Sequence, residues 1–257
     1  MTKPLFSIIT ACYNSVDTIQ RSIDSIKRQT LADYEHIIID GGSIDGTMEI
    51  IKKNQYSKLV WISEKDRGYA DAWNKGLDIS RGRIIGILNS DDIYKEDTFS
   101  IVSEVLKPEA LALSYGITRF FNNDLNGYDY EMNSIFNHDI IYYGFGFMHT
   151  TCFVTKKVYD RVGNFSLNYK IASDSEFLLR CIKNGVDFIN ALNITYMQRG
   201  GMSDVNEVEG YMEFLFQLRQ YNYNLFKIIN AANKRLSLKR IPLARRIQNI
   251  MKLIFNN

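Results

Sequence analysis

The feature that most constrains the fold is a regular alternation of short β-rich runs with helical patterns over the first hundred residues. The runs LFSIIT, HIIID, LVWIS and IIGIL are separated by stretches of helical spacing that begin near Ile19, Thr47 and Ala70. This rhythm is typical of an α/β fold with a mostly parallel sheet. Ligands bind beyond the carboxyl ends of the strands in such sheets, so a site is expected at residues 11–14, 40–46, 63–68 and 89–92.

The second half of the chain is less regular. Strands are expected at residues 110–116, 117–121, 187–190 and 194–198, and a helix is expected to begin at Asp174. The segment QRGGMSD is expected to form a loop, and the pattern is helical from about Asn206 onward. We therefore predict an α/β domain over residues 1–205 and a helical, basic C-terminal extension over residues 206–257.

Composition points to a globular protein of a reducing compartment. The 257 residues include only three cysteines, widely spaced and without a C-x-x-C pair, so neither a disulfide framework nor a cysteine zinc site is expected. The N-terminus lacks the long apolar stretch of a signal peptide, and no apolar run approaches the roughly 18 residues that span a membrane. These features predict a cytoplasmic location.

The charge is distributed unevenly along the chain. Nine of the 31 basic residues follow Glu213 and none of the 29 acidic residues do, so the first 213 residues carry a net charge of −7. An acidic body argues against a nucleic-acid groove, whereas a basic tail favours an anionic partner.

Two adjacent carboxylates, Asp91 and Asp92, follow the apolar run IIGIL. Like charges this close repel each other unless a cation compensates them, and such pairs are a recognised feature of active sites. The alternative is a solvated turn that caps the helix expected near KEDTF.

A nucleotide site is also indicated, although neither G-x-G-x-x-G nor the P-loop pattern occurs. In the run IIIDGGSIDGT, Asp40 ends a strand and can accept a hydrogen bond from a base amine or a ribose hydroxyl. Asp45 is more simply explained as the cap of the helix that follows.

Five motifs in order give the chain a family resemblance. The segments SIITACYNS, IIIDGGSIDGT, EKDRGYADAWNKGL, IGILNSDD and YKIASDSEFLLR resemble those of the family 2 inverting glycosyltransferases, which have the GT-A fold. The likeness spans about residues 5–200. It implies the transfer of a sugar from a nucleotide donor, with a UDP-sugar as the expected donor.

The resemblance also implies roles for residues after the first four strands. Asp66 is expected to reach the nucleotide base, and Asp71 or Lys75 the sugar-diphosphate end. For Arg67, which lies in the same motif, the alternative is a solvated surface charge. The residues expected to hold the nucleotide are Ala11, Tyr13, Asn14 and Asp40, with Tyr13 against the base. For Tyr13 the alternative is an ordinary half-buried strand aromatic.

By the same resemblance, the pair Asp91 and Asp92 is a variant D-x-D motif that binds Mg²⁺ or Mn²⁺ together with the ribose-diphosphate. The chemistry gives an independent reason for such a site. A departing nucleoside diphosphate develops negative charge, and a hard cation held by carboxylate and phosphate oxygens stabilises that charge.

The expected general base is Asp174, because transfer by direct displacement needs a carboxylate to accept the proton of the acceptor hydroxyl. Many relatives have Glu-Asp at this point, whereas this chain has Ser173 before Asp174, which leaves the acceptor contacts open. The alternative makes Asp174 a helix N-cap. His149 either contacts the acceptor or a phosphate, or is a core histidine. Arg199 either closes a glycine-hinged loop over the diphosphate or lies on the surface.

The absence of a Q-x-x-R-W motif argues against a processive polysaccharide synthase, because neither Trp61 nor Trp73 follows an arginine. We therefore expect single transfers, with a lipid-linked oligosaccharide of polysaccharide or O-antigen biosynthesis as the acceptor. Two alternatives stay open: a nucleotidyltransferase that makes sugar nucleotides, and an inactive carbohydrate-binding scaffold. The first would need a basic, glycine-rich N-terminal loop, which SIITACYNS does not supply.

The tail carries an amphipathic pattern after Pro242. An apolar stripe is expected to lie either on an anionic membrane surface, at the inner face of the plasma membrane, or on the catalytic body, and the membrane is slightly favoured. The stripe comprises Leu243, Ile247, Ile250, Met251 and Ile254, with Arg245, Arg246, Asn249 and Lys252 on the other faces.

Overall fold

The computed structural model describes residues 3–122, 129–242, 245, 248–251 and 253. The strands are β1 (Phe6–Cys12), β2 (Tyr34–Asp40), β3 (Leu59–Ser63), β4 (Ile84–Ile87), β5 (Ile93–Tyr94), β6 (Ala112–Phe121), β7 (Tyr130–Met132), β8 (Phe153–Thr155) and β9 (Asp187–Gln198). The helices are α1 (Ile19–Lys27), α2 (Thr47–Lys53), α3 (Tyr69–Ile79), α4 (Thr98–Val105), α5 (Lys156–Val162), α6 (Ser173–Lys183), α7 (Met202–Val205), α8 (Glu207–Gln220) and α9 (Leu225–Leu238), with 3-10 helices η1 (His138–Tyr143) and η2 (His149–Thr151).

The strands form one mixed sheet in the order β3-β2-β1-β4-β8-β6-β9-β5, with β7 paired to β6. The strands β1 to β4 are parallel, as the alternation of the first hundred residues predicted. Strand β8 is antiparallel to both of its neighbours, and β6 and β9 pair in parallel. In the parallel half, Asp40 lies opposite Cys12 of β1 and Ser63 of β3, so three strands end together beside it.

Alternating side chains of β1 bury on opposite faces of the sheet, as the period of a strand requires. Ile9 packs in a core with α3, α5 and α6, whereas Phe6 and Ile8 pack in a second core with α1 and α4. A Cβ at Gly76 would lie 2.5 Å from Ile9, so glycine there lets α3 approach β1 closely. These two layers of helices hold the loops at the carboxyl ends of the strands in place.

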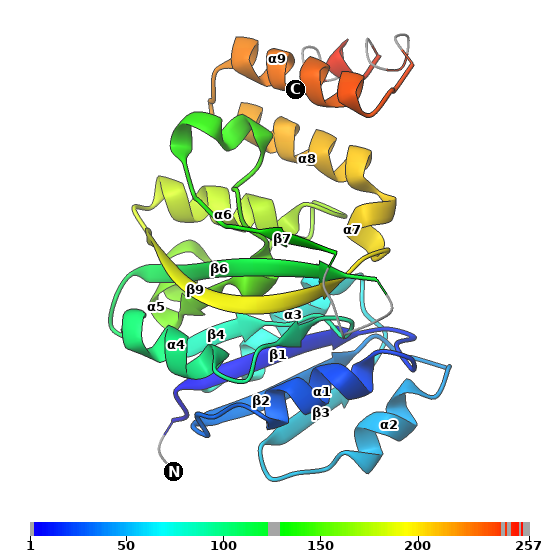
Figure 1. Cartoon of the computed structure of the whole chain (residues 1–257), viewed down its shortest axis with the longest axis vertical. Helices are drawn as coiled ribbons and strands as arrows, with labels where there is room; N and C mark the ends of the chain where they lie inside the picture. Colours follow the sequence, from blue (N-terminus) through cyan, green and yellow to red (C-terminus); the bar gives the residue numbers. More distant parts are fainter. Residues whose placement is uncertain (1–2, 123–128, 243–244, 246–247, 252, 254–257) are drawn as a thin grey trace.

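The C-terminal helices α8 and α9 lie above the sheet at one end of the molecule (Figure 1). Phe214 and Leu218 of α8 and Ala232 of α9 belong to the same buried core as the sheet and α6. Leu253 is 1% exposed and joins that core, and Ile250 packs against it. The predicted helical extension is present, and the described part of it packs on the α/β body.

Several element boundaries differ from those predicted. The two strands expected at residues 110–121 are one strand, β6, with a bulge at Gly116. The two expected at residues 187–198 are also one strand, β9, in which Leu192 has a φ of 59°. Helix α6 begins at Ser173, and the predicted loop QRGGMSD runs into α7. The bulge is tight because a Cβ at Gly116 would lie 2.2 Å from the carbonyl oxygen of Asn193.

Candidate active site

The loops after β1, β2 and β4 are tied together by hydrogen bonds. The backbone N–H of Asn14 donates to Ser43 Oγ at 2.8 Å, and Asn14 Oδ1 accepts from the backbone of Ile44 at 3.0 Å. Asn14 has a φ of 48°, a conformation that asparagine tolerates better than most residues. Ser15 and Ser90 share a hydrogen bond of 2.9 Å between their hydroxyls. The rim of the predicted nucleotide site is therefore ordered by the protein itself.

Asp40 is fully buried at the end of β2, and its carboxylate organises the turn that follows. It accepts hydrogen bonds from Ser63 Oγ at 2.7 Å, from the backbone N–H groups of Gly42 and Ser43 at 3.1 Å, and from Ser43 Oγ. All of these donors belong to the protein. A base or ribose would therefore bind this carboxylate only by displacing one of them, and direct contact stays a prediction.

Tyr13 and Ala11 lie on either side of the end of β1. Tyr13 follows the strand and is 61% exposed, so it is not the half-buried strand aromatic of the alternative interpretation. Ala11 is half-buried and packs against the larger core. An exposed aromatic ring at the rim is available to stack on a base.

Asp66 and Asp45 occupy the loops on either side of this rim. A Cβ at Gly41 would lie 2.7 Å from Asp66 Oδ2, so the glycine lets the Asp66 carboxylate approach the end of β2. Asp45 Oδ1 accepts from the backbone N–H of Thr47 at 3.0 Å and from its hydroxyl at 2.6 Å. Asp45 therefore organises the turn into α2, but the N-cap position is Gly46, so the prediction that Asp45 caps this helix is wrong.

The charged residues at the start of α3 pair with one another. Asp71 accepts from the Arg67 guanidinium at 3.0 Å, and this hydrogen bond holds the pKa of Asp71 below its usual range. Lys75 forms an ion pair with Glu64 at 2.7 Å. The structure thus places Asp71 and Lys75 in a surface network, and their roles toward a sugar-diphosphate stay predictions.

The carboxylate pair after β4 is not a solvated turn. Asp92 is 1% exposed; its Oδ2 accepts from Asn89 at 3.2 Å and its Oδ1 from the backbone N–H of Gln198 at 3.3 Å. Burial raises the pKa of Asp92 well above its usual range, and the neighbouring charge of Asp91 raises it further. Burial also raises the pKa of Asp91. The described protein groups therefore compensate the negative charge of this pair only in part.

Two residues that the sequence did not single out complete this site. Arg21 of α1 donates to the backbone oxygen of Asp91 at 3.4 Å, and its charge favours the ionised form of both carboxylates. Gln198, at the end of β9, has a buried side-chain oxygen with no hydrogen-bond partner among the described residues. Both lie far from Asp91 in the sequence, in segments whose patterns indicated only a helix and a strand.

A hard divalent cation fits this donor set. The described residues contain no group of three side chains that could hold a metal by themselves. Mg²⁺ and related cations are often bound by one or two carboxylates, with substrate phosphates and water completing the shell. Asp91 accepts no side-chain hydrogen bond from another described residue, and the unpartnered oxygen of Gln198 lies on the residue that bonds Asp92. The residues present therefore suit Mg²⁺ or Mn²⁺ held jointly with a diphosphate.

A second carboxylate site pairs Asp174 with His149. His149 Nδ1 lies 3.2 Å from Asp174 Oδ2, and the two side chains are 17% and 24% exposed. Burial alone would raise the pKa of Asp174, but the hydrogen bond and charge of His149 outweigh burial and hold it below the usual range. Asp174 lies in the first turn of α6 and does not cap it, since the N-cap position is Ala172.

The surroundings of this pair are apolar. The ring of Trp73 lies 5.0 Å from that of His149, and His149 Nε2 is buried without a partner among the described residues. A cavity of about 20 Å³ adjoins the pair and is bounded by Ile87 of β4 and Phe165. Ile87 is the last residue of β4, and Asp91 follows it by four residues. Both carboxylate sites therefore lie at the edge of the sheet where β4 ends.

Arg199 directly follows Gln198 at the end of β9. Its guanidinium lies over the Phe120 ring at 5.7 Å and 3.5 Å from Asp204. Gly200 has a φ of 91°, and a Cβ at Gly201 would lie 3.4 Å from Asp91 Oδ2. The glycine segment therefore borders the carboxylate pair, whereas contact of Arg199 with a diphosphate stays a prediction.

Comparison with known proteins identifies the family of this chain. The profile described as "Glycosyl transferase family 2" matches residues 7–177. A "PGL/p-HBAD biosynthesis glycosyltransferase" of Mycobacterium bovis is 29% identical over 214 residues, which is 79% of this chain and 81% of that protein.

Two solved structures share the fold at low sequence identity. S. aureus TarS in complex with UDP-GlcNAc has a TM-score of 0.58 and 18% identity, over 97% of this chain and 71% of that one. The mannosyltransferase PcManGT of Pyrobaculum calidifontis, in complex with GDP-Man and Mn²⁺, has a TM-score of 0.58 and 16% identity, over 98% of this chain and 69% of that one.

The mixed sheet with its covering helices has the fold of the GT-A glycosyltransferases. Within that class, the chain belongs to glycosyl transferase family 2. No helix in the described part of the chain is both long and apolar enough to cross a membrane.

Proposed function

We propose that this glycosyltransferase transfers one sugar, with inversion, from a nucleotide-sugar donor to a hydroxyl of a glycan acceptor. The observation that carries the proposal is the pairing of Asp174 with His149 on the same sheet edge as Asp91 and Asp92. One site holds a carboxylate in its ionised form, and the other brings together two carboxylates that would hold a cation. Direct displacement needs both: a base for the acceptor and a cation for the leaving group.

Asp174 accepts the proton of the acceptor hydroxyl in this proposal. Its lowered pKa keeps it ionised at neutral pH. His149 donates from Nδ1 to Asp174 Oδ2 and so fixes the orientation of the carboxylate. The apolar wall formed by Trp73 and Phe165 limits water at the base, which favours attack by an acceptor hydroxyl over hydrolysis.

Asp91 and Asp92 would hold Mg²⁺ or Mn²⁺ together with the donor diphosphate. When bound, the cation acts as a Lewis acid that stabilises the charge of the departing nucleoside diphosphate. The solved complex of PcManGT with GDP-Man and Mn²⁺ supports this choice of metal. Arg21 supplies positive charge beside the pair and would reduce its repulsion before a donor binds.

The donor would lie along the rim built by the loops after β1, β2 and β4. Tyr13 is exposed there for stacking on the base, and Asn14 holds two of the loops together. A UDP-sugar is the proposed donor, which the TarS complex with UDP-GlcNAc supports.

We place the enzyme in the cytoplasm, with a lipid-linked acceptor of surface-polysaccharide assembly and contact with an anionic membrane through the tail. Lys234 and Arg240 are exposed on and after α9. Of the predicted apolar stripe, Ile250 packs on the body and Met251 is 46% exposed, while Leu243, Ile247 and Ile254 lie outside the described residues. Exposed basic residues near an anionic bilayer contribute about 1 kcal/mol each.

Flotation with liposomes tests the membrane contact. Because Leu236 and Leu253 are buried in the body, truncation of the tail would disturb the fold, so charge substitution is the better test. The variant Lys234→Gln/Arg240→Gln loses two such charges, about 2 kcal/mol, and should bind anionic vesicles about 30-fold more weakly than the wild type at low salt. A matched variant of α2, Lys52→Gln/Lys53→Gln, should bind as the wild type does. Equal binding by all three proteins would reject the tail as a membrane contact.

The activity itself is tested by incubating the protein with UDP-sugars, Mn²⁺ and a lipid-linked glycan, and by reading the anomeric configuration of the product by NMR. Transfer with inverted configuration is expected. A product with retained configuration would exclude direct displacement. Release of a sugar nucleotide from a sugar phosphate and a nucleoside triphosphate would instead identify a nucleotidyltransferase.

A further inference from the structure

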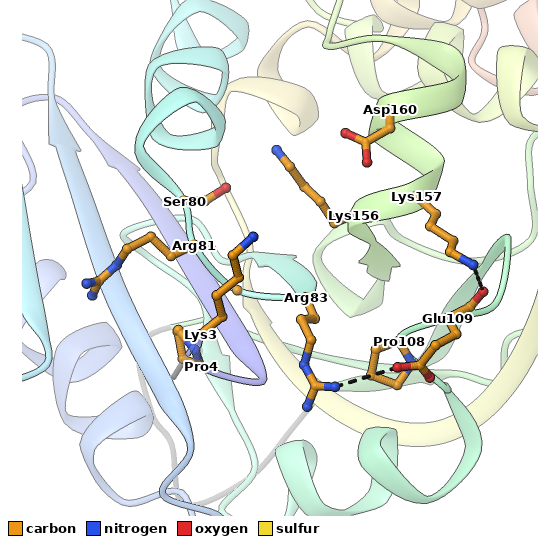
Figure 2. A pocket seen from close by; sticks show the side chains of 11 residues that line it. Lys3, Pro4, Ser80, Arg81, Arg83, Pro108, Glu109, Lys156, Lys157 and Asp160 are labelled. Carbon is orange, nitrogen blue, oxygen red and sulfur yellow. Dashed lines mark hydrogen bonds and ion pairs between the residues drawn. The ribbon is translucent and has the colours of Figure 1, made fainter. Parts of the chain in front are cut away.

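A second pocket lies at the end of the sheet opposite the candidate active site. It has a volume of about 490 Å³, against about 20 Å³ for the cavity beside Asp174. Its walls come from the segment before β1, the loop between α3 and β4, the segment after α4 and helix α5 (Figure 2). Ligand pockets are typically about 300–1,000 Å³ in volume, so this one has the size of a small-molecule site.

The pocket is lined by more positive than negative charge. Arg83 forms an ion pair with Glu109 at 3.6 Å, and Lys157 donates to the backbone oxygen of Glu109. Lys3 and Lys156 have no ion-pair partner among the residues that the structure describes, and Figure 2 shows both side chains extending into the pocket. The acidic residues among the described lining residues are Asp160 and Glu109, and Glu109 is paired with Arg83. A concave surface of one dominant sign focuses its field and attracts oppositely charged ligands.

The wall formed by the loop between α3 and β4 is held by a buried network. Glu35 is 3% exposed; it accepts from Ser7 Oγ at 2.6 Å, from the Arg81 backbone at 2.6 Å and from Arg81 Nε at 2.8 Å. Burial raises the pKa of Glu35, but these hydrogen bonds outweigh it and hold the pKa below its usual range. The Ser7 hydroxyl in turn accepts from the backbone N–H of Gly82 at 2.7 Å.

This network leaves the loop little freedom. A Cβ at Gly82 would lie 2.4 Å from the backbone nitrogen of Ser7, so only glycine allows the loop to lie against β1. Arg81 is turned toward Glu35, and its charge is therefore already compensated. A site whose walls are fixed before binding loses little entropy when a ligand enters.

We propose that this pocket binds the phosphate group of a small phosphate ester or of a phospholipid headgroup. Lys3, Lys156 and Lys157 provide three ammonium groups, which bind phosphate as point charges. Pro4 and Pro108 line the same pocket and offer apolar surface to the organic part of the ligand. The site is separate from the donor site, because it lies at the amino ends of β1 and β4, whereas Asp91 follows the carboxyl end of β4.

Titration of the full-length protein with glycerol 3-phosphate, in EDTA and followed by amide NMR, tests the proposal. The signals of residues 80–83 and 156–157 should shift, independently of those of residues 89–92. The affinity should fall about fivefold in Lys156→Gln and rise about fivefold in Asp160→Asn, because one charge at such a site is worth up to about 1 kcal/mol. The matched variant Lys52→Gln, on exposed α2, should leave the affinity unchanged.

Vesicles distinguish the two sources of phosphate. If phosphatidylglycerol vesicles shift residues 80–83 and 156–157 while glycerol 3-phosphate does not, the ligand is a lipid headgroup; the reverse identifies a soluble ester. Shifts confined to residues 89–92, or an affinity that Lys156→Gln and Asp160→Asn leave unchanged, would overturn the proposal. The test involves neither Asp174 nor a sugar donor, so its failure would leave the proposed transfer activity standing.

Discussion

The two carboxylate sites at the edge of the sheet differ in how their charge is compensated. Asp174 has its partner built into the protein, because His149 donates to it and lowers its pKa. Asp92 is more deeply buried, lies beside another carboxylate, and has a pKa well above its usual range. The comparison teaches that one site is complete without a ligand, whereas the other becomes balanced only when positive charge arrives.

The largest effect should follow from Asp174→Asn. An amide cannot accept the proton of the acceptor, so kcat should fall about 10²- to 10⁴-fold, the usual contribution of a general base. Donor affinity, measured by isothermal titration, should remain within about twofold of the wild type, because the loss is confined to the transition state. A collapse of donor affinity with normal turnover per bound donor would make Asp174 a structural residue.

Asp92→Asn, or removal of divalent metal with EDTA, should reduce kcat about 10²- to 10³-fold through loss of leaving-group stabilisation. Without metal, the variant should also unfold at a temperature equal to or above that of the wild type, because one member of a repelling buried pair is neutralised. Differential scanning calorimetry in EDTA measures whether the unfolding temperature of the variant is above or below that of the wild type. Full activity in EDTA would remove the metal from the mechanism.

The variant His149→Leu removes the partner that lowers the pKa of Asp174. Asp174 should then resemble Asp92, a carboxylate whose pKa is raised by burial. The folded pKa of Asp174 is depressed, so the stability that the pair contributes is present above the unfolded pKa of about 3.8 and is lost as pH falls through the folded value. Without His149, burial dominates and the pKa of Asp174 should rise. The acid limb of kcat/KM should then move to higher pH, with about a tenfold loss of rate at neutral pH. The exposed-residue control His138→Asn should keep the wild-type profile.

The smallest effect is expected from Arg21→Gln. Its charge partly compensates Asp91 and Asp92, so its removal takes a competing positive charge away from the bound cation and should tighten Mn²⁺ binding about twofold to fivefold. Electron paramagnetic resonance of Mn²⁺ measures this directly. Weaker Mn²⁺ binding would show that Arg21 orders the loop of Asp91 rather than competing with the metal.

The contrast between the two sites also shows what the sequence could predict. Asp91 and Asp92 follow an apolar strand, and Asp174 starts a helical pattern, so local periodicity was enough to place all three. Arg21 and Gln198 reach the pair from α1 and β9, through contacts that span 70 and 106 residues of sequence. Local patterns carry no record of such contacts. Strands β6 and β9 were each predicted as two shorter strands for the same reason, because the bulge that joins the halves is seen only in the pairing of the two strands.

The position of β8 has a consequence for how the chain is synthesised. This strand lies between β4 and β6, although about 65 residues separate it from β4 in the sequence. On the ribosome, β1 to β4 can assemble as soon as they emerge, but β4 then keeps an unpaired edge until residue 155 has left the exit tunnel. Unpaired edges invite association between nascent chains. A chaperone would therefore raise the yield of folded enzyme most while the ribosome is synthesising the residues between 87 and 153.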